Sequence, residues 1–213
     1  MIERSWEILA DHPVNRERIV KGQAPANSIW FWGQGRPPRL ATLPERFGIR
    51  GVVISAVDLI NGLGRLVGLE VVRVPGATGY LDSNLYGKAE AALAALAEGC
   101  DLAYVHVEAP DEAGHEGSPA KKIEAIELFD AKVVGPILAG LPGLGPHRIL
   151  VLPDHATPLA VRTHTREPVP FVLYDSREEH SFARGFSEAE AASGEWPEVP
   201  GPRLIEMLLE KYP

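Results

Sequence analysis

The stretch that decides the fold is DLAYVHVEAPDEAGHEG, residues 101–117. Its first part, Leu102–Val107, is mostly apolar and predicts a buried strand. Its second part is polar and contains Asp111 and His115, four residues apart, which one helical turn or a compact loop would aim at the same point. A strand that ends in such a cluster is typical of an α/β sheet, where ligands bind beyond the carboxyl ends of parallel strands.

Strand and helix patterns alternate along the rest of the chain. Further strands are expected at Ser28–Trp32, Gly51–Ser55, Glu70–Val74, Arg148–Leu152 and Pro170–Leu173. Amphipathic helices are expected at Leu43–Phe47, Leu59–Val67, Leu85–Ala97, Lys121–Leu138 and Pro202–Leu209. This alternation predicts a three-layer α/β fold, in which a mostly parallel sheet lies between helices on both faces.

The N-terminal segment differs from the remainder of the chain. Residues 1–27 are polar and show no convincing strand pattern, so they are expected to form a connector that enters the sheet at Ser28. Residues 28–213 are then expected to form one α/β domain. A chain that begins with a connector is expected to be part of something longer.

Composition narrows the possible partners and the compartment. The apolar fraction of 45% is sufficient for a large core, and the net charge of −8 argues against general binding of nucleic acid. The single cysteine, Cys100, cannot form an internal disulfide, which fits a reducing compartment. The sequence shows neither a signal peptide nor an apolar stretch of membrane-spanning length, so a cytoplasmic protein that does not bind membranes is expected.

Two more polar clusters accompany the predicted strands. Asp154 and His155 follow the strand Arg148–Leu152, and His164 precedes the strand Pro170–Leu173. Each cluster alone has an ordinary explanation, such as a chance pair, a capping aspartate or a loop histidine. Three Asp/His clusters on sheet loops together favour a divalent metal centre, whereas His106, within a strand, is expected to be structural.

The mixture of carboxylate and imidazole ligands indicates the kind of metal. Such ligands suit Mn²⁺ or Zn²⁺ better than Ca²⁺ or Mg²⁺, which prefer shells made of oxygen. Two ions about 4 Å apart would hold the attacking and leaving oxygens of a phosphoryl transfer. The clusters therefore predict metal-dependent phosphate chemistry.

Four stretches carry a resemblance to a known family. They are VPGATGYLDSNLYGKAEAAL (74–93), DLAYVHVEAPDEAGHEG (101–117), ILVLPDHATP (149–158) and THTREPVPFVLY (163–174). They resemble the cofactor-independent phosphoglycerate mutases of the archaeal type, within the alkaline phosphatase superfamily. SWEILADHPVN (5–15) and NSIWFWGQG (27–35) resemble a bacterial branch of that family, for which a homoserine kinase role has been proposed.

The resemblance implies a glycolytic isomerase that interconverts 2- and 3-phosphoglycerate through a phosphoserine. It further implies two ions, one held by Asp111, His115 and His164, and the other by Asp154 and His155. In the family, an N-terminal segment supplies the nucleophilic serine, and this chain resembles only the C-terminal half. The chain alone is therefore expected to be inactive or very weak.

Several alternatives remain open at this stage. Ser55 and Thr78 are candidate nucleophiles, although a helix cap and a turn explain them more simply. Weak candidates for substrate contact are Asn61, Arg65 and Lys88, and Asn61 stands where the family often has lysine.

Two other functions remain possible from the sequence. The chain could belong to a phosphotransferase resembling homoserine kinase, or it could be a non-catalytic metal-binding module that acts with a partner chain. Activity restored by a missing N-terminal half would favour an enzyme. A fragment is expected to expose an apolar face and to self-associate.

Overall fold

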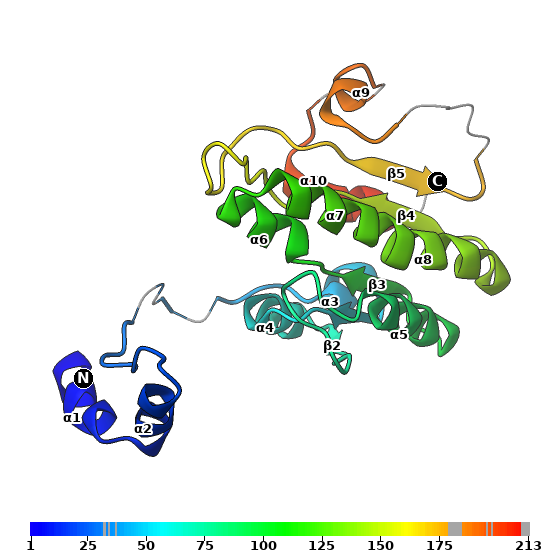
Figure 1. Ribbon diagram of the computed structural model, residues 1–213. Helices are drawn as coiled ribbons and strands as arrows, with labels where there is room; N and C mark the ends of the chain where they lie inside the picture. The colour runs from blue at the N-terminus through cyan, green and yellow to red at the C-terminus, as the bar shows by residue number, and fades with distance from the viewer. Residues whose placement is uncertain are drawn as a thin grey trace. The chain divides into compact units, whose positions relative to one another are not determined.

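The chain forms two compact units, Met1–Arg39 and Leu40–Pro213. The computed structural model describes residues 1–31, 33, 35–36, 38–178, 185–194, 196 and 198–209. Within the described residues, the first unit contains helices only, and the second contains strands and helices (Figure 1).

The first unit contains two short helices, α1 (Ile2–Ala10) and α2 (Pro13–Val20). The sequence prediction had assigned a connector here and had not predicted these helices. Helix α2 begins where the His12 ring accepts a hydrogen bond from the Val14 N–H at 3.3 Å. Pro13 favours the same start, because the first turn of a helix does not need its missing N–H.

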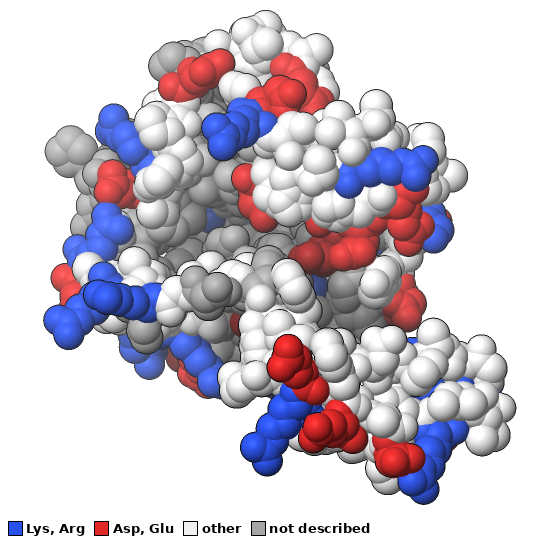
Figure 2. Space-filling model, turned by 90° about the vertical axis from the view of Figure 1, so that its left-hand side faces the viewer, with Lys and Arg blue, Asp and Glu red and all other residues white. Residues whose placement is uncertain are grey.

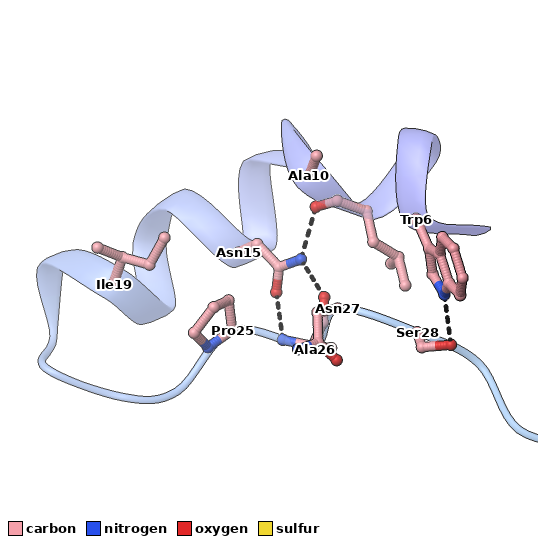
Figure 3. Close-up of a pocket in the computed structure, with 9 residues that line it drawn as sticks. Trp6, Ala10, Asn15, Ile19, Pro25, Ala26, Asn27 and Ser28 are labelled. Atoms are coloured by element: carbon pink, nitrogen blue, oxygen red, sulfur yellow. Dashed lines mark hydrogen bonds between the residues drawn. The ribbon is translucent and has the colours of Figure 1, made fainter. Parts of the chain in front are cut away.

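Asn15 ties α2 to the extended segment that follows it. Its side-chain nitrogen donates to the carbonyl oxygens of Leu9 at 2.7 Å and Ala26 at 2.6 Å, and its oxygen accepts from the Ala26 N–H at 2.8 Å. Figure 3 shows these bonds beside a pocket of about 490 Å³. The pocket is lined by Trp6, Leu9, Ala10, Asn15, Ile19, Pro25, Ala26, Asn27 and Ser28.

The strand predicted at Ser28–Trp32 is wrong for the part that the structure describes. Residues 28–31 belong to no strand, and Trp32 lies outside the described residues. The Ile29 N–H donates to the Ser5 hydroxyl of α1 at 3.1 Å. The Ile29 N–H is thus hydrogen-bonded to a side chain, whereas a β-strand needs backbone hydrogen bonds to a neighbouring strand.

The second unit contains a three-stranded parallel sheet in the order β2-β1-β3. Strand β1 (Gly51–Ile54) is buried along its whole length and pairs with β2 (Glu70–Val71) and β3 (Leu102–Val105). Strands β2 and β3 end earlier than predicted. The register pairs Ile54 with Val105, so the residues that follow these two strands lie side by side.

An apolar cluster lies on each face of this sheet. On one face, Val53 packs with residues of α3 (Leu43–Phe47), α4 (Asp58–Leu66) and α10 (Gly201–Leu209). On the other face, Val52 and Ile54 pack against α5 (Leu85–Ala97) and α8 (Gly135–Gly140). This arrangement confirms the predicted α/β class with helices on both faces, and the predicted helices at α3, α4, α5 and α10.

The last two strands differ from the prediction. Strand β4 (Arg148–Val151) pairs antiparallel with β5 (Val172–Asp175) in a separate two-stranded sheet. Parallel neighbours need a crossover connection, usually a helix, whereas residues 152–171 contain no helix. The connection between β4 and β5 therefore returns the chain in the opposite direction.

The predicted helix Lys121–Leu138 is present but is interrupted. Helix α7 (Pro119–Phe129) continues through a π-helical segment, Asp130–Val134, into α8, and a 3₁₀ turn at Leu141–Leu144 follows. The Gly135 N–H donates to Asp130, five residues back. Pro136 has no backbone N–H to donate to an α-helical hydrogen bond, and the wider π-helical turn accommodates this proline. A short helix α9 (Glu188–Ala192) lies before α10.

The surface carries charges of both signs. On the face shown in Figure 2, described Lys and Arg side chains are interspersed with Asp and Glu side chains. In the part of the chain that the structure describes, no helix combines the length and the apolar character needed to cross a membrane.

An ion-pair network anchors the two-stranded sheet and gives a testable prediction. The Arg148 Nε donates to the buried carboxylate of Asp175 at 2.6 Å, and Arg177 contacts the same carboxylate. Arg177 and Arg148 hold the pKa of Asp175 well below its usual range. We expect Asp175→Asn to lower the free energy of unfolding by about 2 to 3 kcal/mol, because the largely buried Arg148 guanidinium and the exposed Arg177 guanidinium both lose their anion.

The sign of the pH dependence follows from the lowered pKa. The stabilisation is present above the unfolded pKa of about 4 and is lost as the pH falls toward the folded pKa. Between pH 7 and pH 3, the free energy of unfolding measured in urea should fall more for the wild type than for Asp175→Asn. Asp58→Asn, at a side chain that is 91% exposed, is the control and should have little effect. An equal loss in the wild type and Asp175→Asn would contradict the account.

Candidate metal centre

The predicted metal-binding residues come from two parts of the second unit. Helix α6 (Ala109–Glu116) carries Asp111 and His115 one turn apart. Asp154 and His155 lie just beyond β4, and His164 lies in the connection from β4 to β5. Pro110 favours the first turn of α6, and Gly117, with a φ of 71°, ends it.

A single backbone bridge brings the two loop segments together. The Thr165 N–H donates to the Ala156 carbonyl oxygen at 3.0 Å, and these two residues form an isolated antiparallel bridge. The neighbouring rings of His155 and His164 consequently stack, with centroids 3.7 Å apart and an interplanar angle of 29°.

Asp111 is the centre of the resulting group. Its Oδ2 lies 3.2 Å from the His115 Nε2, and its Oδ1 lies 3.4 Å from the His164 Nε2. The two histidine Nε2 atoms are 3.1 Å apart. We refer to Asp111, His115, His155 and His164 as the Asp111 cluster.

The donor chemistry of the Asp111 cluster fits a divalent cation. Ligand atoms of Asp111, His155 and His164 all lie within 4.8 Å of one another, and the first two residues are half-buried. The His115 Nδ1 is 3.0 Å from the Arg162 carbonyl oxygen. A carbonyl only accepts, so Nδ1 carries a proton, and in the neutral ring Nε2 then keeps a lone pair that can bind a cation.

Comparison with known proteins agrees with this chemistry. The sequence pattern of the Metalloenzyme superfamily matches residues 8–211. The chain belongs to the Metalloenzyme superfamily. The matched span includes every member of the Asp111 cluster. Membership of the superfamily and the clustered ligand atoms together indicate a divalent metal.

Two curated relatives of this superfamily member share one functional name. The chain is 51% identical over 212 residues to a Geobacter sulfurreducens protein named "Probable 2,3-bisphosphoglycerate-independent phosphoglycerate mutase". It is 50% identical over 212 residues to the 2,3-bisphosphoglycerate-independent phosphoglycerate mutase of Methanosarcina acetivorans. Each alignment covers 99% of the chain and 53% of the relative, so the chain spans about half the length of these relatives.

Solved structures show the same α/β fold, which is alkaline-phosphatase-like. The PH0037 protein from Pyrococcus horikoshii aligns with a TM-score of 0.83 and 27% identity, covering 100% of this chain and 57% of that one. The cofactor-independent phosphoglycerate mutase from Thermoplasma acidophilum aligns with a TM-score of 0.58 and 25% identity, covering 97% of this chain and 49% of that one.

Asp154 lies at the margin of the Asp111 cluster. Its side chain is 58% exposed, and its Oδ2 is 3.5 Å from the His155 Nε2. The sequence had paired Asp154 and His155 at a second ion, whereas His155 shares the ligand group with Asp111 and His164. The division of the five residues between two ions stays a prediction.

Thr157 contacts the Asp111 cluster, although the sequence did not reveal it. Its buried hydroxyl donates a hydrogen bond to the Asp111 Oδ1 and lies 3.3 Å from the His155 Nδ1. From α7, Lys122 donates to the Thr157 carbonyl oxygen at 2.8 Å. A Cβ on Gly114 would lie 2.6 Å from that oxygen, so α6 reaches Thr157 closely only with glycine there. Metal-binding residues had been predicted from the sequence only among aspartates and histidines.

Arg162, whose carbonyl orients His115, has an unusual backbone. Its φ is 57°, in the left-handed region that residues with side chains seldom adopt. Its guanidinium packs against Gly117, where a Cβ would lie 2.4 Å from Nε. Strain of this kind commonly occurs at functional sites, and here it aims a carbonyl at the Asp111 cluster.

The weak candidates for substrate contact occupy different environments. Arg65 is exposed on α4, whereas Asn61 and Lys88 are buried. The Asn61 Nδ2 donates to the Ser55 carbonyl oxygen at 3.1 Å, and within the described residues its Oδ1 has no partner. Lys88 is 1% exposed and donates to the His106 carbonyl oxygen at 2.9 Å.

The structure also adds two carboxylates that the sequence analysis had not selected. Glu108 and Glu112 lie close enough to Asp111 to form a second group of potential ligands. Burial, followed by the charges of Asp111 and Glu112, raises the pKa of Glu108. The centre is therefore more acidic than its five predicted residues indicated.

The Thr157 hydroxyl gives a test of how Asp111 is held. We expect Thr157→Val, which removes the hydroxyl but keeps the shape, to weaken Zn²⁺ or Mn²⁺ binding at least tenfold, because hydrogen bonds to a ligand orient it. Thr157→Ser retains the hydroxyl and should bind within a few-fold of the wild type. Calorimetric titration measures both affinities. Equal affinities in Thr157→Val and Thr157→Ser would show that the bond does not support metal binding.

Proposed function

We propose that this chain is the metal-binding half of a 2,3-bisphosphoglycerate-independent phosphoglycerate mutase, a glycolytic enzyme of the cytoplasm. The observation that carries the proposal is the convergence of Asp111, His155 and His164, with ligand atoms within 4.8 Å of one another. The names of the curated relatives supply the reaction. The phosphorylated substrate is then 2- or 3-phosphoglycerate, which are interconverted through a phosphoserine.

The metal is proposed to be Mn²⁺ or Zn²⁺, because imidazole and carboxylate groups predominate in the cluster. When bound, the cation supplies positive charge to the oxygens of a phosphoryl group. Within the chain, Thr157 orients Asp111, and the Arg162 carbonyl oxygen orients His115. Because these hydrogen bonds are already present in the fold, they do not have to form during the reaction. We further propose that the whole enzyme binds up to two ions, and that Asp154 and His155 are ligands of the second.

The remaining predictions fit the same proposal. Residues 1–27 would connect to the other half, and residues 28–213 would form the metal-binding domain. Exposed Arg65 is the better placed of the weak candidates to contact substrate. The relatives' names favour the mutase over a homoserine kinase-like phosphotransferase or a non-catalytic module.

The metal centre is tested first by metal content. Protein purified without chelator should hold about one Mn²⁺ or Zn²⁺ per chain, and His115→Ala and His164→Ala should lose most of it, because each removes an imidazole from the cluster. Elemental analysis measures the content. His147→Ala, whose ring lies beside the Gly145 carbonyl, is the matched control and should retain the ion. Equal metal content in the wild type and the three variants would overturn the proposed metal centre.

The edges of the two sheets support a proposal for where the other half of the protein packs. Strand β3 pairs with β1 alone and β4 with β5 alone among the described residues, and Tyr104 on β3 is 43% exposed. Uncovered strand edges attract other strands. We propose that the further half of the relatives' length packs against these edges, and that the isolated chain self-associates there.

Co-expression tests the assignment of the reaction. The chain together with the N-terminal half of the Geobacter relative should interconvert 2- and 3-phosphoglycerate, and His164→Ala should abolish this activity. The isolated chain should be inactive, and it should be larger than a monomer by light scattering. A stable complex that binds metal but lacks mutase activity would refute the assigned reaction and leave the metal centre intact.

A further inference from the structure

A buried polar group links the carboxyl ends of β1 and β3. Ser55 follows β1, and His106 follows β3. The His106 N–H donates to the Ile54 carbonyl oxygen at 2.9 Å, which extends the pairing of the two strands by one residue. The Ser55 hydroxyl and the His106 Nδ1 are 3.1 Å apart. We refer to Ser55, Lys88 and His106 as the junction group.

Lys88 is the most unusual member of the junction group. It lies on α5, is 1% exposed, and donates its ammonium proton to the His106 carbonyl oxygen at 2.9 Å. Burial lowers the pKa of Lys88, and the charge of Glu108 acts in the opposite direction. A buried charge destabilises a fold relative to an apolar side chain of similar length, so packing alone does not explain a lysine here.

The hydrogen bonds around His106 have a defined direction. The Ser55 hydroxyl accepts from the Val57 N–H at 3.0 Å, so its own proton is available for the His106 Nδ1. In this arrangement the ring proton lies on Nε2, which is 3.6 Å from the Glu108 carboxylate. His106 thus faces serine on one side and a carboxylate of the metal centre on the other.

The position of His106 in the chain connects the junction group to Asp111. The chain passes through Val107 and Glu108 before α6 begins at Ala109, and Asp111 lies in the first turn. Asp111 and Glu112 donate their N–H groups to the Glu108 carbonyl oxygen at 2.8 and 3.2 Å. A fixed His106 therefore restricts where α6 begins and where the Asp111 carboxylate points.

We propose that Ser55, Lys88 and His106 are positioning residues that fix the start of α6 and thereby hold Asp111 in place for metal binding. The inference rests on the proposed metal centre. It also assigns Lys88 a role inside the fold, in place of the substrate contact expected from the sequence. Because the ammonium bonds a backbone carbonyl at the end of a strand, Lys88 acts on the path of the chain.

The test compares Lys88→Met, Ser55→Ala and Ala92→Gly in the full chain. Lys88→Met keeps the length of the side chain and removes its charge, and Ser55→Ala removes the hydroxyl that faces His106. Ala92→Gly loosens the same helix as Lys88, at a residue that packs in the apolar cluster on the sheet. Two quantities are measured: the Zn²⁺ dissociation constant, and hydrogen exchange at the α6 amides by NMR.

Both junction variants should weaken Zn²⁺ binding about tenfold and speed exchange at the α6 amides. Ala92→Gly should change neither the Zn²⁺ affinity nor the exchange at the α6 amides, even if it lowers the free energy of unfolding by as much as the junction variants do. Unchanged affinity and exchange in Lys88→Met and Ser55→Ala, or equal effects in Ala92→Gly, would overturn the positioning role.

Failure of the metal centre gives a different result. If the wild type binds no Zn²⁺, the proposed function fails, and α6 exchange alone decides whether the junction group positions the helix. Faster exchange in the two junction variants supports positioning of α6, and unchanged exchange overturns it.

Discussion

The backbone pairing of β1 with β3 is the constraint on which the rest of the second unit depends. A Cβ on Gly51 would lie 2.8 Å from the Leu102 carbonyl oxygen, so glycine permits the close start of this pairing. The ladder then runs to the Ile54 carbonyl oxygen, which accepts from the His106 N–H. It fixes the end of β3, and α6, which carries Asp111, begins a few residues later. The location of Asp111, and of the cluster around it, is thus set by strand register before any ligand is considered.

The other half of the Asp111 cluster is positioned by contacts between distant parts of the chain. The connection from β4 to β5 contains no helix, yet it supplies His155 and His164. The Ala156–Thr165 bridge folds the connection back on itself, and Lys122 of α7 holds the Thr157 carbonyl oxygen. These bonds bring two imidazoles to α6 without a regular element beneath them. The cluster is consequently assembled from a rigid helix on one side and a cross-linked loop on the other.

Local patterns were sufficient to predict much of this architecture. The bounds of α3 and α5 match their apolar periodicity, and the spacing of Asp111 and His115 places both on one side of α6. The antiparallel direction of β5 was missed because side-chain patterns do not report the path of the connecting loop. Helices α1 and α2 were missed because a polar segment can be ordered by caps such as His12 and by buried amides such as Asn15. Thr157 was missed because a hydroxyl becomes important only through its neighbour, Asp111.

The unfavourable local features of the second unit gather at the carboxyl ends of its strands. Val52, Val53 and Ile54 of β1 are buried in apolar surroundings, but immediately beyond them the fold buries Lys88 and the Asn61 side chain. Nearby, two histidine Nε2 atoms face each other at 3.1 Å, and Arg162 adopts a left-handed backbone. A sequence optimised only for stability would avoid each of these features. Cation binding explains the histidine pair beside Asp111, because a cation between the facing nitrogens and the carboxylates would turn their mutual repulsion into attraction.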